Sequence, residues 1–309
     1  MGKRQSRPWI VSDELWPLIE PLLPRPGPKP VAGRPRVPDR QALCGILFVL
    51  HTGIRWQYLP QELGFGSGMT CWRRLLTTLA GDDTVHVIVF DSADPDFVLA
   101  HVDMTATPDA LAGLMADLPD GVNVFQAVKE QLRRQPQVTI VKLAGKARGG
   151  GAEFVVAADM AFAAIGKAGP GQIEALMGIV PGGGATQYLA ERVGRNRASE
   201  IVLGADLTDA ETAERYGWVN RAVPVDQLDE FVDRLAGDIA ALPGGVVAAA
   251  KRTIVLHDHS DGLARENVAW AGLVFRPATA QLMGAGLANG VQTRDGEQGL
   301  EDPFRKLAG

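Results

Sequence analysis

Residues 142–164 read KLAGKARGGGAEFVVAADMAFAA, in which three adjacent glycines precede Glu153 and a mostly apolar run. Glycine serves where the backbone must adopt unusual dihedral angles or approach another group closely. A carboxylate is costly to bury without a partner. The stretch therefore predicts one of two structures: a ligand bound by bare backbone amides beside an acid, or a tight turn before a core helix with Glu153 at its solvated end.

This stretch belongs to a longer alternation of strands and helices that begins near residue 76. Runs rich in β-forming residues over 85–92, 137–145, 158–166 and 218–224 predict strands. Strands that alternate with helices predict an α/β fold with a parallel sheet. The segments with the apolar spacing of helices cover 106–118, 121–136, 185–204, 208–217, 227–242 and 244–256.

The composition is that of an ordinary globular protein, with 309 residues of which 46% are hydrophobic and 22% charged. No apolar run has the length needed to cross a bilayer, and the basic start of the chain is not followed by an apolar signal segment. Cys44 and Cys71 are too few for a disulfide framework. We therefore expect a cytoplasmic protein without a membrane partner.

The net charge of −5 conceals an asymmetry along the chain. Residues 1–79 carry 11 Lys and Arg and 5 Asp and Glu, a net charge of +6, whereas the remainder has a net charge of −11. Residues 1–75 also hold four of the six tryptophans and ten of the twenty prolines. Such a difference predicts two segments of separate origin or function, 1–75 and 76–309.

From about residue 76 to its end the chain resembles the enoyl-CoA hydratase/isomerase (crotonase) superfamily. The matching segments occur in family order and include VHVIVFDSADPDFVLAHVDM, KLAGKARGGGAEFVVAADMAFA, GQIEALMGIVPGGGATQYLAERVG and EIVLGADLTDAETAERYGWVNRAVP. The resemblance implies an α/β superhelix of ββα turns, truncated at its N-terminus in this chain. It also implies C-terminal helices that assemble a homotrimer or hexamer.

The resemblance assigns roles to individual residues. The backbone N–H groups of Val102 and Gly150 would form an oxyanion hole for the thioester oxygen of an acyl-CoA, worth about 3–4 kcal/mol per donor. Glu153 and Glu174 would form the catalytic acid–base pair, with Glu174 in place if one residue is inserted between Asp159 and Gly171. Without the family, Glu174 has a simpler interpretation as a solvated helix residue. The implied substrate-binding residues are Ala100, His101, Asp103, Gly149, Gly151, Pro181 and Gly182.

The implied function is that of an enzyme adding water to, or isomerising, an α,β-unsaturated acyl-CoA thioester. Hydration needs a water molecule held on one face and a proton delivered at Cα. No metal and no bound redox cofactor are expected, since coenzyme A arrives as part of the substrate. His257 and His259 lack further close ligands in the sequence and are more simply read as part of a solvated loop. The residues specify neither the acyl chain nor the choice between the two reactions.

Two departures from the family pattern bear on this function. His101 stands where the family's Ala-Gly-x-Asp segment has glycine. Its imidazole would contact the substrate, narrow the pocket or mark a different acyl-CoA reaction. The family's N-terminal hairpin and its segment that contacts CoA have no counterpart ahead of residue 76, so we expect weakened CoA affinity and lower stability.

Residues 1–75 resemble the N-terminal region of IS5-type insertion-element transposases. The matching text is RPWIVSDELWPLIEPLLP and GRPRVPDRQALCGILFVLHTGIRWQYLPQELGFGSGMTCWRRL. The resemblance implies a small, helical, basic segment joined to the second one by gene fusion. Asp91 superficially matches the first metal-binding acid of such transposases, but it lies in a crotonase-like block and is assigned to the end of a strand there. Two alternatives to an enzyme follow: a non-catalytic fusion that binds DNA phosphates through 1–75, and an inactive crotonase scaffold.

Overall fold

The structure, a computed structural model, describes residues 7–24, 36–52, 54, 56–105, 121–254 and 257–308. The chain divides into two compact units, one containing the described residues up to Val85 and the other those from His86 onward. Helix α3 (Gly68–Ala80) runs through the predicted junction at residue 75 and belongs to the first unit. The helix predicted over 106–118 lies outside the described residues.

The described residues of the first unit form short helices and connecting loops, in agreement with the helical segment that the sequence predicts. Ser67 starts α3 by accepting a hydrogen bond from the backbone N–H of Thr70, as a good N-cap does. The other elements of this unit are α1 (Trp16–Ile19), η1 (Glu20–Leu22), α2 (Asp39–Thr52), η2 (Trp56–Tyr58) and η3 (Gln61–Leu63).

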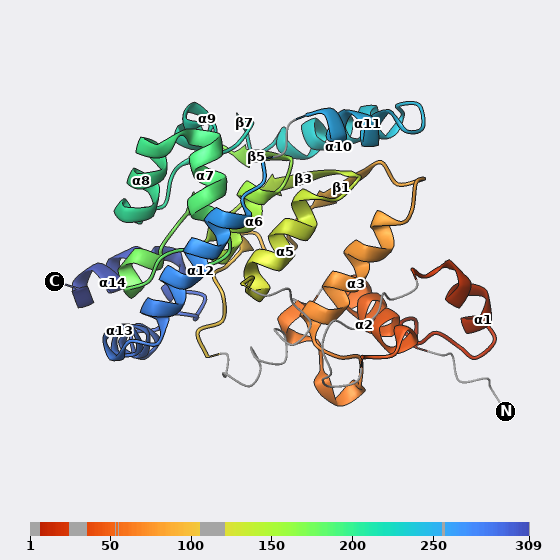
Figure 1. The fold of residues 1–309 in the computed structure, drawn as a ribbon, viewed down its shortest axis with the longest axis horizontal. Helices are drawn as coiled ribbons and strands as arrows, with labels where there is room; N and C mark the ends of the chain where they lie inside the picture. Colours follow the sequence, from red (N-terminus) through yellow and green to blue (C-terminus); the bar gives the residue numbers. More distant parts are fainter. Residues whose placement is uncertain are drawn as a thin grey trace. The chain divides into compact units, whose positions relative to one another are not determined.

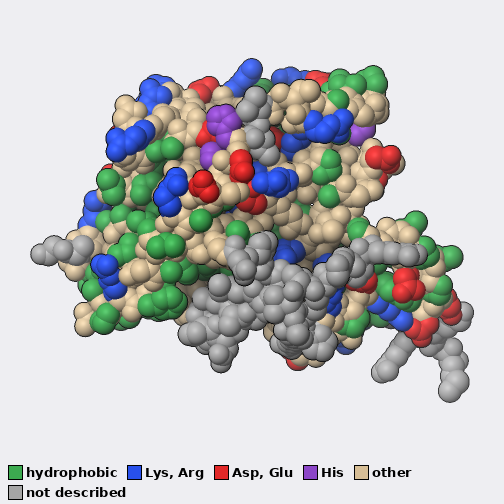
Figure 2. Space-filling model, viewed as in Figure 1, with side chains coloured by type: hydrophobic (Ala, Val, Ile, Leu, Met, Phe, Trp, Pro, Cys, Tyr) green, Lys and Arg blue, Asp and Glu red, His purple; other side chains and the backbone are tan. Residues whose placement is uncertain are grey.

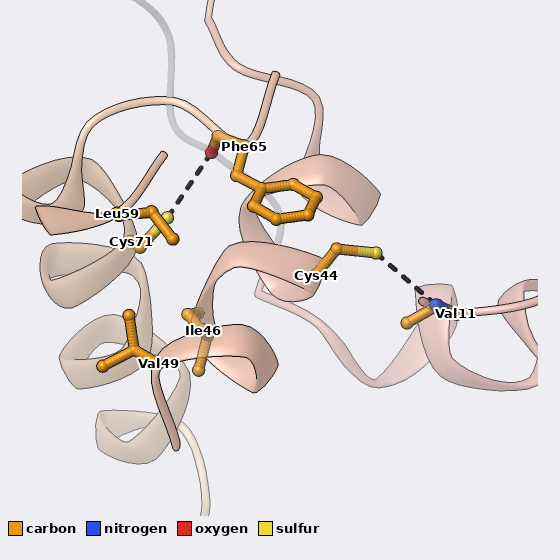
Figure 3. Close-up of a cluster of buried hydrophobic side chains, with 7 residues drawn as sticks. All are labelled: Val11, Cys44, Ile46, Val49, Leu59, Phe65 and Cys71. Atoms are coloured by element: carbon orange, nitrogen blue, oxygen red, sulfur yellow. Dashed lines mark hydrogen bonds between the residues drawn. The ribbon is translucent and has the colours of Figure 1, made fainter. Parts of the chain in front are cut away.

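The core of the first unit lies between α2 and α3. A methyl group added at Gly45 of α2 would lie 2.7 Å from Cys71 Sγ and 2.8 Å from Phe65 Cβ, so only glycine lets the two helices approach this closely. Burial raises the pKa of the Cys71 thiol to about 11, which keeps this thiol protonated. Figure 3 shows the buried side chains, which are Val11, Cys44, Ile46, Val49, Leu59, Phe65 and Cys71.

Two parallel sheets form the frame of the second unit, and Figure 1 labels the strands of the larger one. Consecutive strands alternate between a sheet of order β1-β3-β5-β7 and a sheet of order β2-β4-β6. Helices α5 and α6 follow the first and second strand pairs, so the unit is the predicted superhelix of ββα turns. The strands are β1 (Val87–Phe90), β2 (Phe97–Leu99), β3 (Val138–Leu143), β4 (Lys146–Arg148), β5 (Met160–Ala164), β6 (Gly169–Gly171) and β7 (Arg221–Val223).

Strand β3 is one of the two inner strands of the larger sheet and is buried along most of its length. A parallel strand covered on both faces takes such a continuous apolar sequence rather than an alternating one. Lys142 is its half-buried exception, and its ammonium group pairs with Asp91 at the end of β1 and with Asp229 Oδ1 at 2.8 Å. Asp91 is thus a structural partner of β3, as its assignment to a strand end predicts.

Helices cover both sheets of the second unit. Helix α10 packs on β1, β3 and β5, and α6 packs on all three strands of the smaller sheet. No helix among the described residues is long and apolar enough to cross a membrane. The bounds are α5 (Val124–Arg133), α6 (Gly150–Ala157), η4 (Glu174–Met177), α7 (Ala185–Val193), α8 (Arg195–Gly204), α9 (Ala210–Tyr216), α10 (Leu228–Ala240), α11 (Val246–Thr253), α12 (Ser260–Val274), α13 (Pro277–Ala288), η5 (Gly296–Gly299) and α14 (Glu301–Ala308).

Candidate active site

The glycine turn joins the end of β4 to the start of α6. Gly149 has φ +50°, a backbone conformation that residues with a side chain rarely adopt. A methyl group at Gly151 would clash with the Leu99 carbonyl and lie 2.7 Å from Leu99 Cβ. Gly151 therefore permits close contact between α6 and β2, a role in packing that comes in addition to the predicted role in substrate binding.

The two predicted oxyanion donors lie close together. Gly150 is in the first turn of α6, where backbone N–H groups have no acceptor within the helix. A methyl group added at Gly150 would lie 3.9 Å from the Val102 nitrogen and 4.0 Å from Glu153 Oε2. Within the described part of the chain, neither the Val102 nor the Gly150 N–H has a hydrogen-bond acceptor. The structure thus brings two free backbone donors and a carboxylate to one place.

Glu153 is buried on α6, with 2% of its surface exposed, so the interpretation that placed it at a solvated helix end is wrong. Its Oε1 accepts a hydrogen bond of 2.6 Å from the backbone N–H of Gly183, and its Oε2 lies 3.5 Å from Lys129 Nζ. Both contacts are of the charge-assisted kind that stabilises a carboxylate.

Glu174 begins η4 and is also buried, with 6% of its surface exposed, which excludes the solvated helix position. A methyl group at Gly149 would lie 2.9 Å from Glu174 Oε1, so this glutamate faces the same glycine turn. Burial, and then the charge of Glu153, raise the pKa of Glu174 well above its ordinary value. Its Oε2 is buried and has no hydrogen-bond partner among the described residues. Glu174 therefore favours the neutral acid.

The loop after η4 holds Glu153 in place and is itself held from two sides. Asn123 Nδ2 donates to the Gly182 carbonyl at 2.7 Å, and Gly183 donates to Glu153. Glu266 Oε1 accepts from the Gly184 N–H at 2.6 Å. Pro181 and Gly182, both predicted to bind substrate, are buried in this loop.

Several functional neighbours were missed from the sequence, and the first group lies on α5. Asn123, Gln126 and Lys129 recur at three-residue spacing, which places polar side chains on one helical face. That face is buried, and Lys129 reaches Glu153 from it. The sequence could have predicted this polar face from the regular spacing of these polar residues among apolar ones.

Glu266 of α12 is the second missed residue. Besides the Gly184 N–H, its carboxylate accepts from the Thr186 N–H at 3.0 Å, from the Thr186 hydroxyl and from Gln126 Nε2 at 3.1 Å. Burial, and then the charge of Glu153, raise the pKa of Glu266 to about 7. No local pattern distinguishes this glutamate from Asp261, the exposed acid of the same helix.

The turn after β2 carries Val102 between two residues that are bound to the C-terminal part of the chain. His101 Nε2 lies 2.8 Å from Glu297 Oε1, and Gln292 Nε2 donates to Asp103 Oδ1 at 2.9 Å. Burial opposes a charge on His101, but Glu297 and the Val102 carbonyl outweigh it and raise the pKa of the imidazole. Ala100 is half-buried beside them.

The imidazole of His101 does not occupy the place between the two oxyanion donors. The three atoms nearest to a methyl group at Gly150 are Val102 Cγ2, the Val102 nitrogen and Glu153 Oε2. The His101 ring is engaged instead by Glu297 and by the carbonyl of Val102. The side chain nearest to a methyl group at Gly150 is that of Val102, whose Cγ2 would lie 2.9 Å away.

Other polar groups of the second unit make structural contacts away from these residues. His259 Nε2 lies 2.7 Å from Glu191 Oε2, and histidine side chains on the visible face lie among acidic and basic ones (Figure 2). A cavity of about 520 Å³ lies between α10 and the edge of the larger sheet and includes neither catalytic candidate. Its lining includes Phe231 with the Arg221 and Arg234 guanidinium groups stacked on the ring.

Two family models match the chain. The model described as "Enoyl-CoA hydratase/isomerase" matches residues 72–271, and the model described as "Putative transposase of IS4/5 family" matches residues 11–81. The two matches overlap within and just beside α3.

Known relatives match the same two parts. An uncharacterized 16.2 kDa protein of insertion element IS402 from Burkholderia cepacia is 48% identical over 112 residues, which are 34% of this chain and 76% of that protein. Mitochondrial methylglutaconyl-CoA hydratase from Homo sapiens is 28% identical over 205 residues, 64% of this chain. The match spans 59% of the human protein, less than two thirds of its length.

Solved structures resemble the second part. The crystal structure of a putative enoyl-CoA hydratase from Streptomyces avermitilis has a TM-score of 0.76 and 63% identity, covering 78% of this chain and 89% of that one. An enoyl-CoA hydratase from Bacillus anthracis has a TM-score of 0.56 and 25% identity, covering 75% of this chain and 87% of that one.

Proposed function

The chain belongs to the enoyl-CoA hydratase/isomerase family, with a transposase-like segment at its N-terminal side, and from this premise we propose that it hydrates an α,β-unsaturated acyl-CoA thioester. One observation carries the proposal. The N–H groups of Val102 and Gly150 have no acceptor among the described residues and lie beside two buried glutamates.

In the proposed reaction the thioester oxygen accepts hydrogen bonds from Val102 and Gly150 as negative charge develops on it. Each such donor contributes about 3–4 kcal/mol to stabilisation of the transition state. The oxygen of water bonds to Cβ, and one water proton passes to Glu153. Glu174 gives its proton to Cα, so the elements of water are added across the double bond. Return of the proton from Glu153 to Glu174 restores the resting enzyme.

The two glutamates suit opposite roles because their surroundings differ. Glu153 has the Lys129 ammonium at 3.5 Å and the Gly183 N–H, and therefore serves as the base. Glu174 has a raised pKa and serves as the proton donor. Paired carboxyl groups whose environments favour different protonation states are a common basis for assigning acid and base.

Hydration is tested by the loss of crotonyl-CoA absorbance in the purified full-length chain. We expect the variants Glu153→Gln and Glu174→Gln each to lower kcat by about 10²–10⁴-fold, because each removes one proton-transfer group. Glu214→Gln, on the exposed side of α9, is the matched control and should retain wild-type activity. Wild-type turnover that persists in either buried variant would contradict the assignment of that glutamate.

Double-bond isomerisation is the second candidate reaction, because it uses the same oxyanion hole and only one acid. It is distinguished by supplying a β,γ-unsaturated thioester and following the appearance of the α,β-isomer without uptake of water. Thermal stabilisation by an acyl-CoA tests pocket integrity independently of turnover. If the chain binds no acyl-CoA but shows a gel shift with DNA that weakens with salt, the non-catalytic fusion is the better interpretation.

The proposal needs no metal and no bound redox cofactor, since coenzyme A enters with the substrate. We further propose that the enzyme acts in the cytoplasm as a homotrimer or hexamer assembled through its C-terminal helices. Val268 and Phe275, in and just after α12, are 75% and 80% exposed, which supports an apolar contact between copies. Light scattering coupled to size-exclusion chromatography measures this assembly, and a monomeric chain would contradict it.

A further inference from the structure

We propose that His101 is a positioning residue whose imidazolium, bound by Glu297, fixes the turn that carries the Val102 N–H and so makes the oxyanion hole dependent on pH. The inference rests on the proposed function, since it concerns the same donor. It starts from His101, which stands in the turn where the family has glycine.

Both ring nitrogens of His101 face hydrogen-bond acceptors. Nε2 lies 2.8 Å from Glu297 Oε1, and Nδ1 lies 2.8 Å from the Val102 carbonyl oxygen. A neutral imidazole has a single N–H and can donate to only one of them, whereas the imidazolium donates to both. The observed pair of contacts therefore belongs to the protonated ring.

The carbonyl that His101 holds belongs to the residue that supplies the oxyanion N–H. Fixing the Val102 carbonyl restricts rotation of the backbone around Val102 and so restricts the direction of its N–H. Donors act on developing charge only when they are oriented in advance, and a displacement of about 1 Å can cost about 100-fold in rate.

Gln292 and Glu297, which we call the C-terminal clasp, hold the turn at further points. Glu297 Oε1 also accepts from the Gln292 N–H at 3.0 Å. The Gln292 side chain accepts from the Met104 N–H at 2.5 Å and donates to Asp103 Oδ1 at 2.9 Å. The clasp is therefore bound to the chain on both sides of Val102, and its titratable contacts with the turn among the described residues are the base His101 and the acid Asp103.

The charged groups around the imidazole act in both directions. Glu297 of η5 and Asp103 of the turn favour its positive charge, whereas Arg148 of β4 opposes it. Arg148 is itself neutralised by Glu301 of α14, at 2.7 Å between Nε and Oε1. A methyl group at Gly149 would lie 2.9 Å from Glu174 Oε1 and 3.4 Å from His101 Cβ, so Glu174 is also near His101, and it favours the neutral acid.

Loss of the His101 proton removes one of its two hydrogen bonds, either the one to the Glu297 carboxylate or the one to the Val102 carbonyl. The expected kcat/KM for crotonyl-CoA is then highest below the pKa of His101 in the folded protein. It falls as pH rises through that pKa, on the alkaline side of the profile.

The test combines this pH profile with an NMR titration of the five histidines, using the full-length chain. The His101 resonance is assigned by its disappearance in His101→Gln, and its pKa should coincide with the alkaline limb of kcat/KM. Glu297→Gln should move the His101 titration and the alkaline decline of kcat/KM to lower pH by about 1–3 units, because the negative charge beside the imidazolium is lost. His101→Gln should abolish the limb. The control His257→Gln, whose ring is exposed beside Glu191, should change neither.

Hydrogen exchange of the segment 97–105, measured without substrate at one pH below the His101 pKa, tests the clasp independently of catalysis. Loss of one hydrogen bond should make exchange about fivefold faster in Glu297→Gln than in the wild type. If the wild type does not hydrate crotonyl-CoA, but its His101 titration and its hydrogen exchange are as expected, hydration is refuted and the proposed role of the clasp stands. An alkaline limb that stays in place in both variants, or exchange unchanged by Glu297→Gln, would overturn the proposal. The wild-type titration decides the point if a variant does not fold.

Discussion

A single methyl group at Gly183 should disable the proposed site without replacing either of its glutamates. In Gly183→Ala the added carbon would lie 2.7 Å from Glu153 Cδ and 2.9 Å from Lys129 Nζ, both buried. Neither distance is tolerable for a carbon atom, so either the loop or the buried ends of Glu153 and Lys129 must shift. In both cases the 2.6 Å hydrogen bond from Gly183 to Glu153 is disturbed.

The magnitude follows from two separate costs. Overpacking a dense interior destabilises a protein by about 1–3 kcal/mol. In a unit of this size each kcal/mol lowers Tm by about 2–4 °C. Displacement of Glu153 by about 1 Å should lower kcat by about 100-fold, equivalent to about 2.7 kcal/mol in the barrier.

The assay measures crotonyl-CoA hydration and thermal unfolding on the same preparations. Gly204→Ala is the matched control, because a methyl group there meets nothing within 4 Å among the described residues. The control should keep wild-type kcat and Tm. If Gly183→Ala also kept both, the inference that the loop positions Glu153 would be refuted.

Three further predictions concern charge and packing. Lys129→Met should destabilise the chain by about 3–5 kcal/mol in urea unfolding, because Glu153 would be left as a buried unpaired charge, and adding Glu153→Gln should recover most of the loss. The pKa of Glu266 is raised from 4.5 to about 7. The contribution of Glu266 to the free energy of unfolding is therefore complete below pH 4.5 and declines by about 3 kcal/mol as pH rises to 7. Glu266→Gln should remove this decline from the free energy of unfolding measured against pH. Gly45→Ala should destabilise the first unit by about 1–3 kcal/mol, followed by the fluorescence of Trp9, Trp16, Trp56 and Trp72, and an unchanged midpoint would contradict the tight packing of α2 on Cys71.

The strands and the glycine turn could be predicted from the sequence because their signals are local. Strand β3 is rich in β-branched and other apolar residues, and the turn before α6 is marked by three glycines. The superhelix itself came from the family resemblance, which fixes how such local elements are connected in space.

The partners of the glutamates could not be predicted because they come from distant parts of the chain. Lys129 is 24 residues from Glu153, and Glu266 reaches the loop at Gly184 across 82 residues. The direction of the His101 side chain depends on Glu297, 196 residues away, so the turn's own sequence left several interpretations open. Local pattern shows that a polar group is present, but only packing decides what it contacts.

The pairing of His101 with Glu297 also has a consequence for the order of events on the ribosome. At about 5–20 residues per second, the 196 residues between them take roughly 10–40 s to synthesise. During that interval the sheets can form while His101 still lacks its partner Glu297. The turn that carries Val102 is therefore among the last parts of the nascent chain to gain its contacts, and translation that stalls before Glu297 would leave His101 without this partner.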